Sequence, residues 1–310
     1  MRLPTRLPKH WTLLAVGLFA CQAGETDVAE EAVEPATAPA AGAVEVVADD
    51  YSFLAPDSIP SGWTTFRMVN QGNEPHFFLL NRLPEGRTIE DYGTEVGAAF
   101  DSVWSGLEGG SIGKAEAGAM LGRLLPVWYA DVRLMGGVGL LAPGHTAETT
   151  ARLEPGSYVM ECYVKTADGR FHSELGMVLP ITVSTDVSER EAPVSDLDIT
   201  LTNAAMVVAG QPTAGEHTVA VHFREHPAAG LGNDVHLARL DGARVEEIVP
   251  WMDWMNVDGL RAPAPAPFLG GTQEMPVGET AYFQATLEPG RYAWISETAA
   301  ERLVQEFTIE

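Results

Sequence analysis

Basic residues are scarce in this 310-residue chain, which has 19 Lys and Arg against 43 Asp and Glu and a formal net charge of −24. A surface of this sign repels nucleic-acid phosphates and anionic lipid headgroups, so nucleic-acid binding is excluded as a function. The charge suits a basic partner or a cation. An acidic balance is also common among proteins that are simply well solvated, and that reading stays open.

Long hydrophobic runs are missing after the N-terminus, which excludes a membrane-spanning helix in the rest of the sequence. Residues 1–21 join a basic segment, containing Arg2, Arg6 and Lys9, to the apolar run WTLLAVGLFA, a pattern typical of an export signal. The end of this run, LFAC, resembles a bacterial lipobox, although Phe19 is an unusual residue within one. The resemblance implies cleavage before Cys21 and lipid attachment to Cys21. An ordinary secretory signal is the alternative.

The lipobox resemblance also implies a location. The protein would be exported and held by lipid as an outer-membrane or periplasm-facing lipoprotein. Position 22 is Gln rather than the Asp that favours retention in the inner membrane. Residues 22–43 contain almost no large apolar side chains and are rich in Ala, Glu and Pro. Such a segment cannot bury enough surface to fold, so we expect a disordered tether.

Cysteine is the other scarce residue, with Cys21 and Cys162 alone in the chain. Two cysteines exclude a disulfide framework, and if Cys21 carries lipid then Cys162 has no partner. Free thiols outside the cytoplasm tend to be oxidised. Cys162 must therefore be protected, either by burial as a small apolar side chain or by binding a metal.

Several catalytic motifs are absent as well. The sequence has no G-x-S-x-G elbow, no H-E-x-x-H pair and no glycine-rich loop that opens a nucleotide-binding fold. These absences argue against a serine hydrolase, a zinc protease or a nucleotide-dependent enzyme.

What the chain does contain is an internal repeat. GHTAETTARLEPGSY at 144–158 and GETAYFQATLEPGRY at 278–292 share nine residues at equivalent places, and the earlier parts of the two copies align with Gly62 on Gly215. The repeat indicates one fold present twice, and the length allows two domains. We place them at 44–188 and 194–310, on either side of a polar segment that contains Pro193.

Each copy predicts a β-sandwich. The segments are short, alternating, rich in β-branched and aromatic residues, and bounded by Gly and Pro turns, as in antiparallel Greek-key sandwiches. Copy one also carries a helical insertion, since apolar residues recur at three- and four-residue steps from Tyr92 to Leu107 behind a Thr88/Asp91 capping pair. Weaker helices are predicted at 114–125 and 243–255.

The order of four residues then carries a family resemblance. NQGNEPHFFLL places His76 at the start of a middle strand, and GSYVMECYV leads through Cys162 to His172 and Met177. This pattern resembles the cupredoxins, the fold of the blue copper proteins, over most of 45–187 and more weakly over 196–310. The resemblance implies that His76, Cys162, His172 and Met177 meet at one end of the first sandwich and bind a single copper ion.

One feature departs from the family. Nine residues separate Cys162 from His172, where blue copper proteins usually have two to four. The segment KTADG must therefore make its own turn before His172 can return to the site. Without that turn, His76 would be a structural histidine at a strand start, and Cys162 and Met177 would be core residues.

Copy two lacks the same ligands. Ser296 replaces Cys162, Asn233 lies near the position of His76, and the last loop has neither His nor Met. Its other histidines are His217, His222, His226 and His236, of which His222 and His236 could approach across a sheet. We interpret them as hydrogen-bonded structural residues.

These observations favour an exported cupredoxin-like lipoprotein that carries one copper and transfers single electrons, with a basic redox protein such as a cytochrome as partner. The alternative is a metal-free binding or scaffolding protein, in which a cleft near Trp251 and Trp254 holds a ligand. Oxidase activity ranks third, because Glu161 and Tyr163 flank Cys162 where copper oxidases often place histidine, and a dinuclear copper centre would need a second cysteine.

Overall fold

Alternation of apolar and polar side chains determines most of the strands. In β14 (Thr280–Leu287), every second residue from Ala281 to Leu287 is buried.

The computed structural model describes residues 42–228 and 230–310. The predicted signal peptide, Cys21 and nearly all of the predicted tether lie outside the described residues.

The first half folds as a β-sandwich whose two sheets share one long strand, β3 (Ser58–Asn70). The C-terminal part of β3 pairs with two strands of the first sheet, and its N-terminal part pairs with β8 in the second. The other strands of this half are β1 (Val44–Asp49), β2 (Ser52–Leu54), β4 (Leu79–Arg82), β5 (Arg133–Leu134), β6 (Thr146–Leu153), β7 (Gly156–Glu161) and β8 (Val178–Val187).

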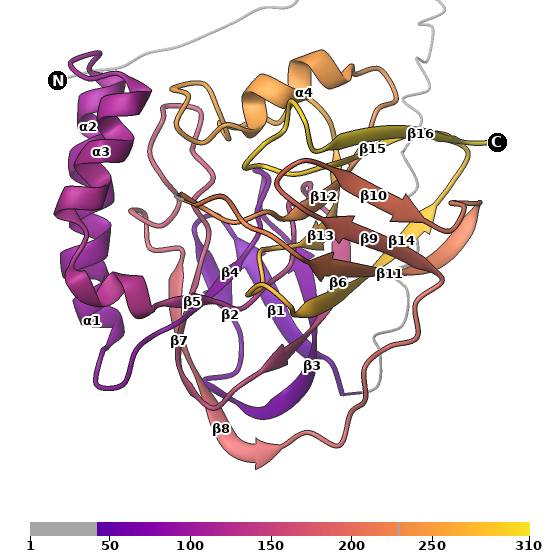
Figure 1. Ribbon diagram of the computed structural model, residues 1–310, viewed down its shortest axis with the longest axis horizontal. Coiled ribbons are helices and arrows are strands. Elements are labelled where there is room, and N and C mark those ends of the chain that lie inside the picture. The colour runs from indigo at the N-terminus through magenta and orange to yellow at the C-terminus, as the bar shows by residue number, and fades with distance from the viewer. Residues whose placement is uncertain (1–41, 229) are drawn as a thin grey trace, which may run out of the picture. The chain divides into compact units, whose positions relative to one another are not determined.

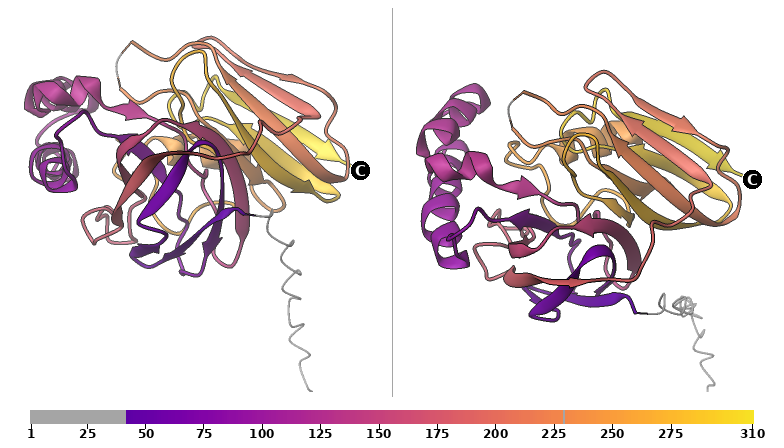
Figure 2. Two further views of the ribbon diagram at one scale, coloured as in Figure 1. Left: turned by 90° about the horizontal axis from the view of Figure 1, so that it is seen from below. Right: turned by 60° about the horizontal axis from the view of Figure 1, so that its bottom comes forward.

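The second half forms another sandwich (Figures 1 and 2). One sheet has the order β10-β9-β11-β14 and the other β13-β12-β15-β16. The strands are β9 (Leu197–Leu201), β10 (Met206–Ala209), β11 (Gly215–Phe223), β12 (Val235–Arg239), β13 (Phe268–Thr272), β15 (Gly290–Ile295) and β16 (Val304–Ile309). The mostly β, tandem-sandwich architecture predicted from the sequence is confirmed.

Strand register reproduces the repeat. Gly62 in β3 lies opposite Leu153 in β6, and Gly215 in β11 lies opposite Leu287 in β14. After each Leu-Glu-Pro, Gly156 and Gly290 adopt φ values of 155° and 156°. Glycine tolerates this backbone region, so the same residue recurs at both turns.

The two halves are joined by strand pairing. Tyr282 and Phe283 of β14 lie opposite Thr150 and Thr149 of β6, which places β14 and β6 in one 12-stranded sheet. The described residues belong to one compact unit. Residues 188–196, between β8 and β9, lie outside any strand or helix. The division into domains at 44–188 and 194–310 stays a prediction.

Helices cover the first half on one side (Figure 1). Thr88 and Asp91 form the predicted capping box at the start of α1 (Ile89–Asp91), and the chain continues through the π-helical segment η1 (Tyr92–Gly97) into α2 (Ala98–Glu108). Then follow α3 (Lys114–Leu124), the 3-10 turn η2 (Val127–Asp131) and, in the second half, α4 (Val245–Met252). In the part of the chain that the structure describes, no helix has both the length and the apolar character to cross a membrane.

Candidate metal centre

The four predicted ligands come from the ends of strands in the first sandwich. His76 precedes β4 and is fixed by two backbone hydrogen bonds with Leu141, at 3.1 and 2.7 Å. Cys162 directly follows β7, and His172 and Met177 lie in the segment before β8. Sandwich strands that end at the same edge bring these residues to one place.

The long Cys162–His172 segment folds back through a turn of its own. Thr166 and Arg170 are joined by a backbone hydrogen bond of 2.9 Å, and the His172 N–H donates to the Val164 carbonyl at 2.8 Å. Gly169 adopts a φ of 93° in this turn. The turn that the sequence required is therefore present, and His172 returns to Cys162.

Three donor atoms converge at the centre. His76 Nδ1 lies 3.1 Å from His172 Nδ1, and Cys162 Sγ lies 3.6 Å from His172 Nδ1 and 4.0 Å from His76 Nδ1. A metal bonded to nitrogen at about 2.0 Å and to sulfur at about 2.3 Å holds its donors roughly 3.5 Å apart. The spacing of these atoms therefore fits one small metal ion.

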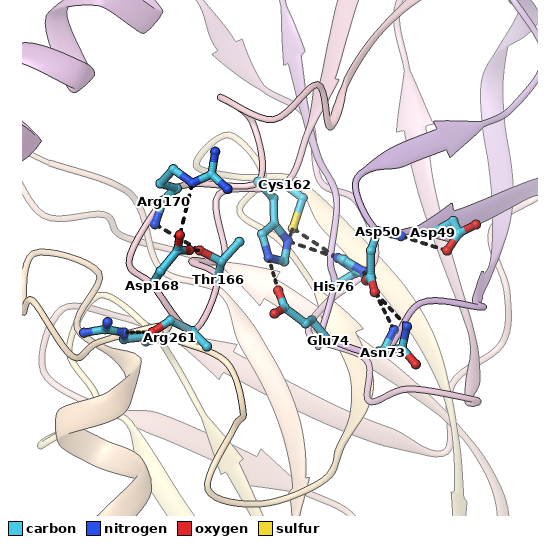
Figure 3. Close-up of polar contacts among 12 residues, drawn as sticks. Asp49, Asp50, Asn73, Glu74, His76, Cys162, Thr166, Asp168, Arg170 and Arg261 are labelled. Atoms are coloured by element: carbon cyan, nitrogen blue, oxygen red, sulfur yellow. Dashed lines mark hydrogen bonds and ion pairs between the residues drawn. The ribbon is translucent and has the colours of Figure 1, made fainter.

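Two carboxylates fix the ring orientation. His76 Nε2 lies 2.8 Å from Asp50 Oδ1, and His172 Nε2 lies 2.8 Å from Glu74 Oε2. Because a carboxylate accepts hydrogen bonds, Nε2 carries the proton in both rings. Figure 3 shows Asp50 beside His76. Metal-binding histidines commonly have a partner of this kind at the other nitrogen.

The consequence is a cluster of lone pairs. A neutral imidazole has one N–H, so both Nδ1 atoms are acceptors and face each other at 3.1 Å. They cannot hydrogen-bond to each other. Burial lowers the pKa of His76 and lowers that of His172 to about 3, which disfavours a bridging imidazolium. A cation between the rings removes the conflict, because both lone pairs can then bind it. Two unprotonated nitrogens facing one point are what a metal site requires.

Cys162 is inert as a thiol but suited as a ligand. It is 0% exposed, and burial raises its pKa to about 12, although backbone hydrogen bonds from Phe77 and Val164 favour the thiolate. A metal that binds here must displace the thiol proton. The same backbone hydrogen bonds would stabilise the bound thiolate.

Met177 lies beside the other ligands. It is 0% exposed, its carbonyl accepts the Cys162 N–H at 3.1 Å, and its N–H donates to the His172 carbonyl at 3.0 Å. Tyr51 packs its ring 4.8 Å from that of His172 and closes the site on one side. His76, Cys162, His172 and Met177 are thus a buried group with the two-histidine, cysteine and methionine composition of blue copper sites.

The second half has hydrogen-bonded groups at the corresponding positions. Ser296, which replaces Cys162, donates to Asp234 Oδ1 at 2.8 Å. Asp234, His236 and Glu297 are close enough together to bind a cation. However, the Leu140 N–H donates to His236 Nδ1, so His236 Nε2 carries the proton and donates it to Asp234. Metal binding through His236 Nε2 would break both bonds, because the ring proton would move to Nδ1, which could then no longer accept from Leu140.

The remaining histidines of this half are hydrogen-bonded too. His222 lies in β11 and contacts Thr280 and Asp198. His236 lies in β12, which belongs to the other sheet. Their approach across one sheet, considered from the sequence, is therefore wrong.

Several residues of the centre escaped sequence reasoning. Asp50 and Glu74 contact the two histidines. Gly72 makes room for the Asp50–His76 pair, because a Cβ there would lie 2.3 Å from Asp50 Oδ1 and 2.7 Å from His76 Nε2. Glu74 lies two residues before His76 but contacts His172, so its place in the sequence does not indicate its partner. Asp50 comes from another strand end, and no sequence pattern connects it with His76.

No family model matches the chain, and neither does any curated protein. Among solved structures, reduced auracyanin from Roseiflexus castenholzii is 16% identical, with a TM-score of 0.28 over 46% of this chain and 96% of its own. A multicopper oxidase is 12% identical, with a TM-score of 0.23 over 86% of this chain and 88% of its own. A Cu-containing nitrite reductase from Thermus scotoductus SA-01 is 11% identical, with a TM-score of 0.22 over 86% of this chain and 61% of its own.

The architecture of the molecule itself is that of a cupredoxin-like protein. Each half is a β-sandwich, and in the first half a histidine before a middle strand meets the cysteine and histidine that follow a late strand. Met177 is buried and hydrogen-bonded through its backbone to both Cys162 and His172. The fold is cupredoxin-like, as predicted, and the donor set fits copper.

Proposed function

We propose that this protein binds one copper ion through His76, Cys162 and His172, with Met177 as a weak fourth ligand, and transfers single electrons. The observation that carries the proposal is the pair of Nδ1 lone pairs and the Cys162 sulfur facing one point, with both Nε2 protons held by carboxylates. A copper held by one thiolate and two imidazoles changes between Cu(I) and Cu(II) with little rearrangement.

The protein's own residues would keep this centre rigid and dry. Asp50 and Glu74 orient the two rings, and the side chains of both histidines are 0% exposed. Backbone hydrogen bonds to the Cys162 sulfur, together with its burial, would set the reduction potential. A rigid centre of this kind suits electron transfer better than substrate turnover.

Acidic residues near the centre support a basic partner. Asp50 and Glu74 remain 17% and 19% exposed at their side chains, and Asp49 and Asp168 nearby are exposed. With a net charge of −24, such a surface attracts a positively charged redox protein such as a cytochrome and speeds its encounter. We include this partner in the proposal.

The proposal also includes export and lipid anchoring at Cys21. It predicts that the full chain, expressed in a bacterium, sediments with membranes and that Cys21→Ser releases it. A wild-type chain without lipid by mass spectrometry would contradict the anchor and leave the copper centre unaffected.

Voltammetry of the copper-loaded protein tests electron transfer. We expect one reversible one-electron couple, and Met177→Leu should shift its potential while the copper stays bound, because only a weak ligand is lost. Copper that binds without any reversible couple would contradict the function and favour the scaffolding alternative.

A further inference from the structure

A cavity lies directly behind the Cys162 segment, between the helical insertion and the first sandwich. Its volume is about 180 Å³, and its wall includes Tyr92, Phe100, Tyr129, Glu161, Phe171 and Trp254. Tyr92 and Phe100 belong to the helical insertion, and Trp254 comes from the second half, after α4. Three separate parts of the chain therefore surround one space, which is lined mainly by aromatic and aliphatic side chains.

The cavity wall contains the carboxyl groups of Asp101, Glu161 and Glu174, of which Asp101 and Glu174 hydrogen-bond to each other and Glu161 uses only one of its two oxygens. Glu161 Oε1 accepts from the Tyr92 hydroxyl at 2.7 Å and from Asn81 Nδ2 at 2.9 Å. In the part of the chain that the structure describes, no group donates to Glu161 Oε2. The second oxygen is thus free to accept a hydrogen bond from a molecule in the cavity.

The size and composition of the wall limit what can enter. An apolar cavity of about 150 Å³ is large enough for benzene, so this one takes a single six-membered ring with a small substituent. None of the described residues that line it is Lys, Arg or His, so nothing there pairs with an anion. Pockets of this type use apolar walls for affinity and a few polar groups for orientation.

We propose that this cavity binds a small neutral molecule made of one six-membered ring with a hydroxyl group, phenol being the simplest. The ring would contact the aromatic side chains of the wall, and the hydroxyl would donate to Glu161 Oε2. The site is formed by side chains that do not ligate the metal, so it exists with or without copper. A molecule bound there would lie next to the metal centre, since Glu161 directly precedes Cys162 in the chain.

Calorimetric titration of the full chain without added metal tests the site, with phenol, toluene and benzoate as probes. We expect phenol to bind with one-to-one stoichiometry and about tenfold more tightly than toluene, which lacks the donor. Benzoate should not bind detectably. Absence of phenol binding, or equal binding of benzoate, would overturn the proposal.

Two variants locate the binding to the cavity. Gly97→Leu adds a side chain at a helical residue of the wall, where a Cβ has only the Tyr92 carbonyl within 4 Å, and should abolish phenol binding. Glu161→Leu, whose side chain neither donates nor accepts a hydrogen bond, should reduce phenol affinity to that of toluene. The matched control is Gly118→Leu, at a helical glycine of α3 with open space around it, which should bind phenol like the unaltered protein.

Circular dichroism shows whether each variant is folded. A folded Gly97→Leu protein that still binds phenol would overturn the assignment to this cavity, and so would a folded Glu161→Leu protein that keeps the preference for phenol over toluene. Phenol binding by a protein that takes up no copper would contradict only the electron-transfer function.

Discussion

Asp50 and Glu74 determine which nitrogen of each histidine faces the centre. Replacing either carboxylate by its amide, in Asp50→Asn or Glu74→Gln, removes the charged acceptor that holds the Nε2 proton. We expect copper affinity to fall about 10- to 100-fold for each, as is typical when the hydrogen-bond partner of a metal-binding histidine is changed. Competition titration with a copper chelator measures this change.

Asp57→Asn is the control for these variants, because Asp57 is an exposed carboxylate between β2 and β3. It should leave copper affinity unchanged. If Asp50→Asn behaves like Asp57→Asn, the carboxylate does not orient His76.

Glu274 gives the protein a measurable pH dependence. Burial raises its pKa to about 8, whereas the same group in the unfolded chain titrates near 4.5. Between these values the folded state binds more protons than the unfolded state, so this group lowers the free energy of unfolding as the pH rises from 4.5 to 8. The steepest loss is about 1.4 kcal/mol per pH unit.

Glu274→Gln removes that slope. Urea unfolding at pH 5 and pH 8 should show the variant gaining stability relative to the unaltered protein as the pH rises. Glu301→Gln, at an exposed carboxylate, should show no such trend. An equal difference at both pH values for Glu274→Gln would mean that Glu274 ionises as it does in the unfolded chain.

At the level of elements, α2 supports the segment between Cys162 and His172. The Trp104 Nε1–H donates to the Gly169 carbonyl at 3.1 Å, and the Trp104 ring lies 5.0 Å from that of Phe171. Lys165 Nζ lies 4.0 Å from the Trp104 ring centroid and donates to the Trp254 and Asn256 carbonyls. One tryptophan thus contacts Lys165, Gly169 and Phe171 in the segment that returns His172 to the centre.

Trp104→Ala should therefore affect both stability and metal binding. Loss of a buried tryptophan costs about 3–5 kcal/mol of unfolding free energy, and a loosened turn should weaken copper binding. Urea unfolding and chelator competition measure the two effects. The comparison variant Trp128→Ala, on the 3-10 turn of the same insertion, should leave copper affinity unchanged. If copper affinity is also unchanged in Trp104→Ala, the turn holds His172 without α2.

The predictability of the site differed between its elements. The ligand order, the repeat and the capping box of Thr88 could be read from the chain because each depends on local spacing. Asp50, the Lys165 contacts and the partner of Glu161 could not, since they join residues that are distant in sequence. The long spacing between Cys162 and His172 predicts a turn after Cys162, but tertiary contacts such as that of Trp104 with Gly169 determine the path of this turn.

At the scale of the whole molecule, the two halves share strand pairing between β6 and β14 and the contacts of Lys165. Each half nevertheless has its own pair of sheets. We therefore expect fragments 44–188 and 194–310 to unfold cooperatively on their own, with lower stability than in the full chain, because separation exposes β6 and β14 as edges.

Circular dichroism and urea unfolding of the separate fragments check this prediction. A fragment that stays disordered alone and gains structure only when mixed with the other would show that the halves depend on one shared core, and the division into two domains would be wrong.

The most direct test of the copper centre is the visible absorption of the full chain after one equivalent of Cu(II). The Cys21→Ser background makes Cys162 the sole thiol. The account predicts an intense blue or green colour from charge transfer between thiolate and copper, one copper per chain, and loss of the colour in Cys162→Ser because a hydroxyl cannot replace the soft sulfur donor. A colourless, copper-free protein whose Cys162 is reduced and free by thiol titration under unfolding conditions would contradict the account.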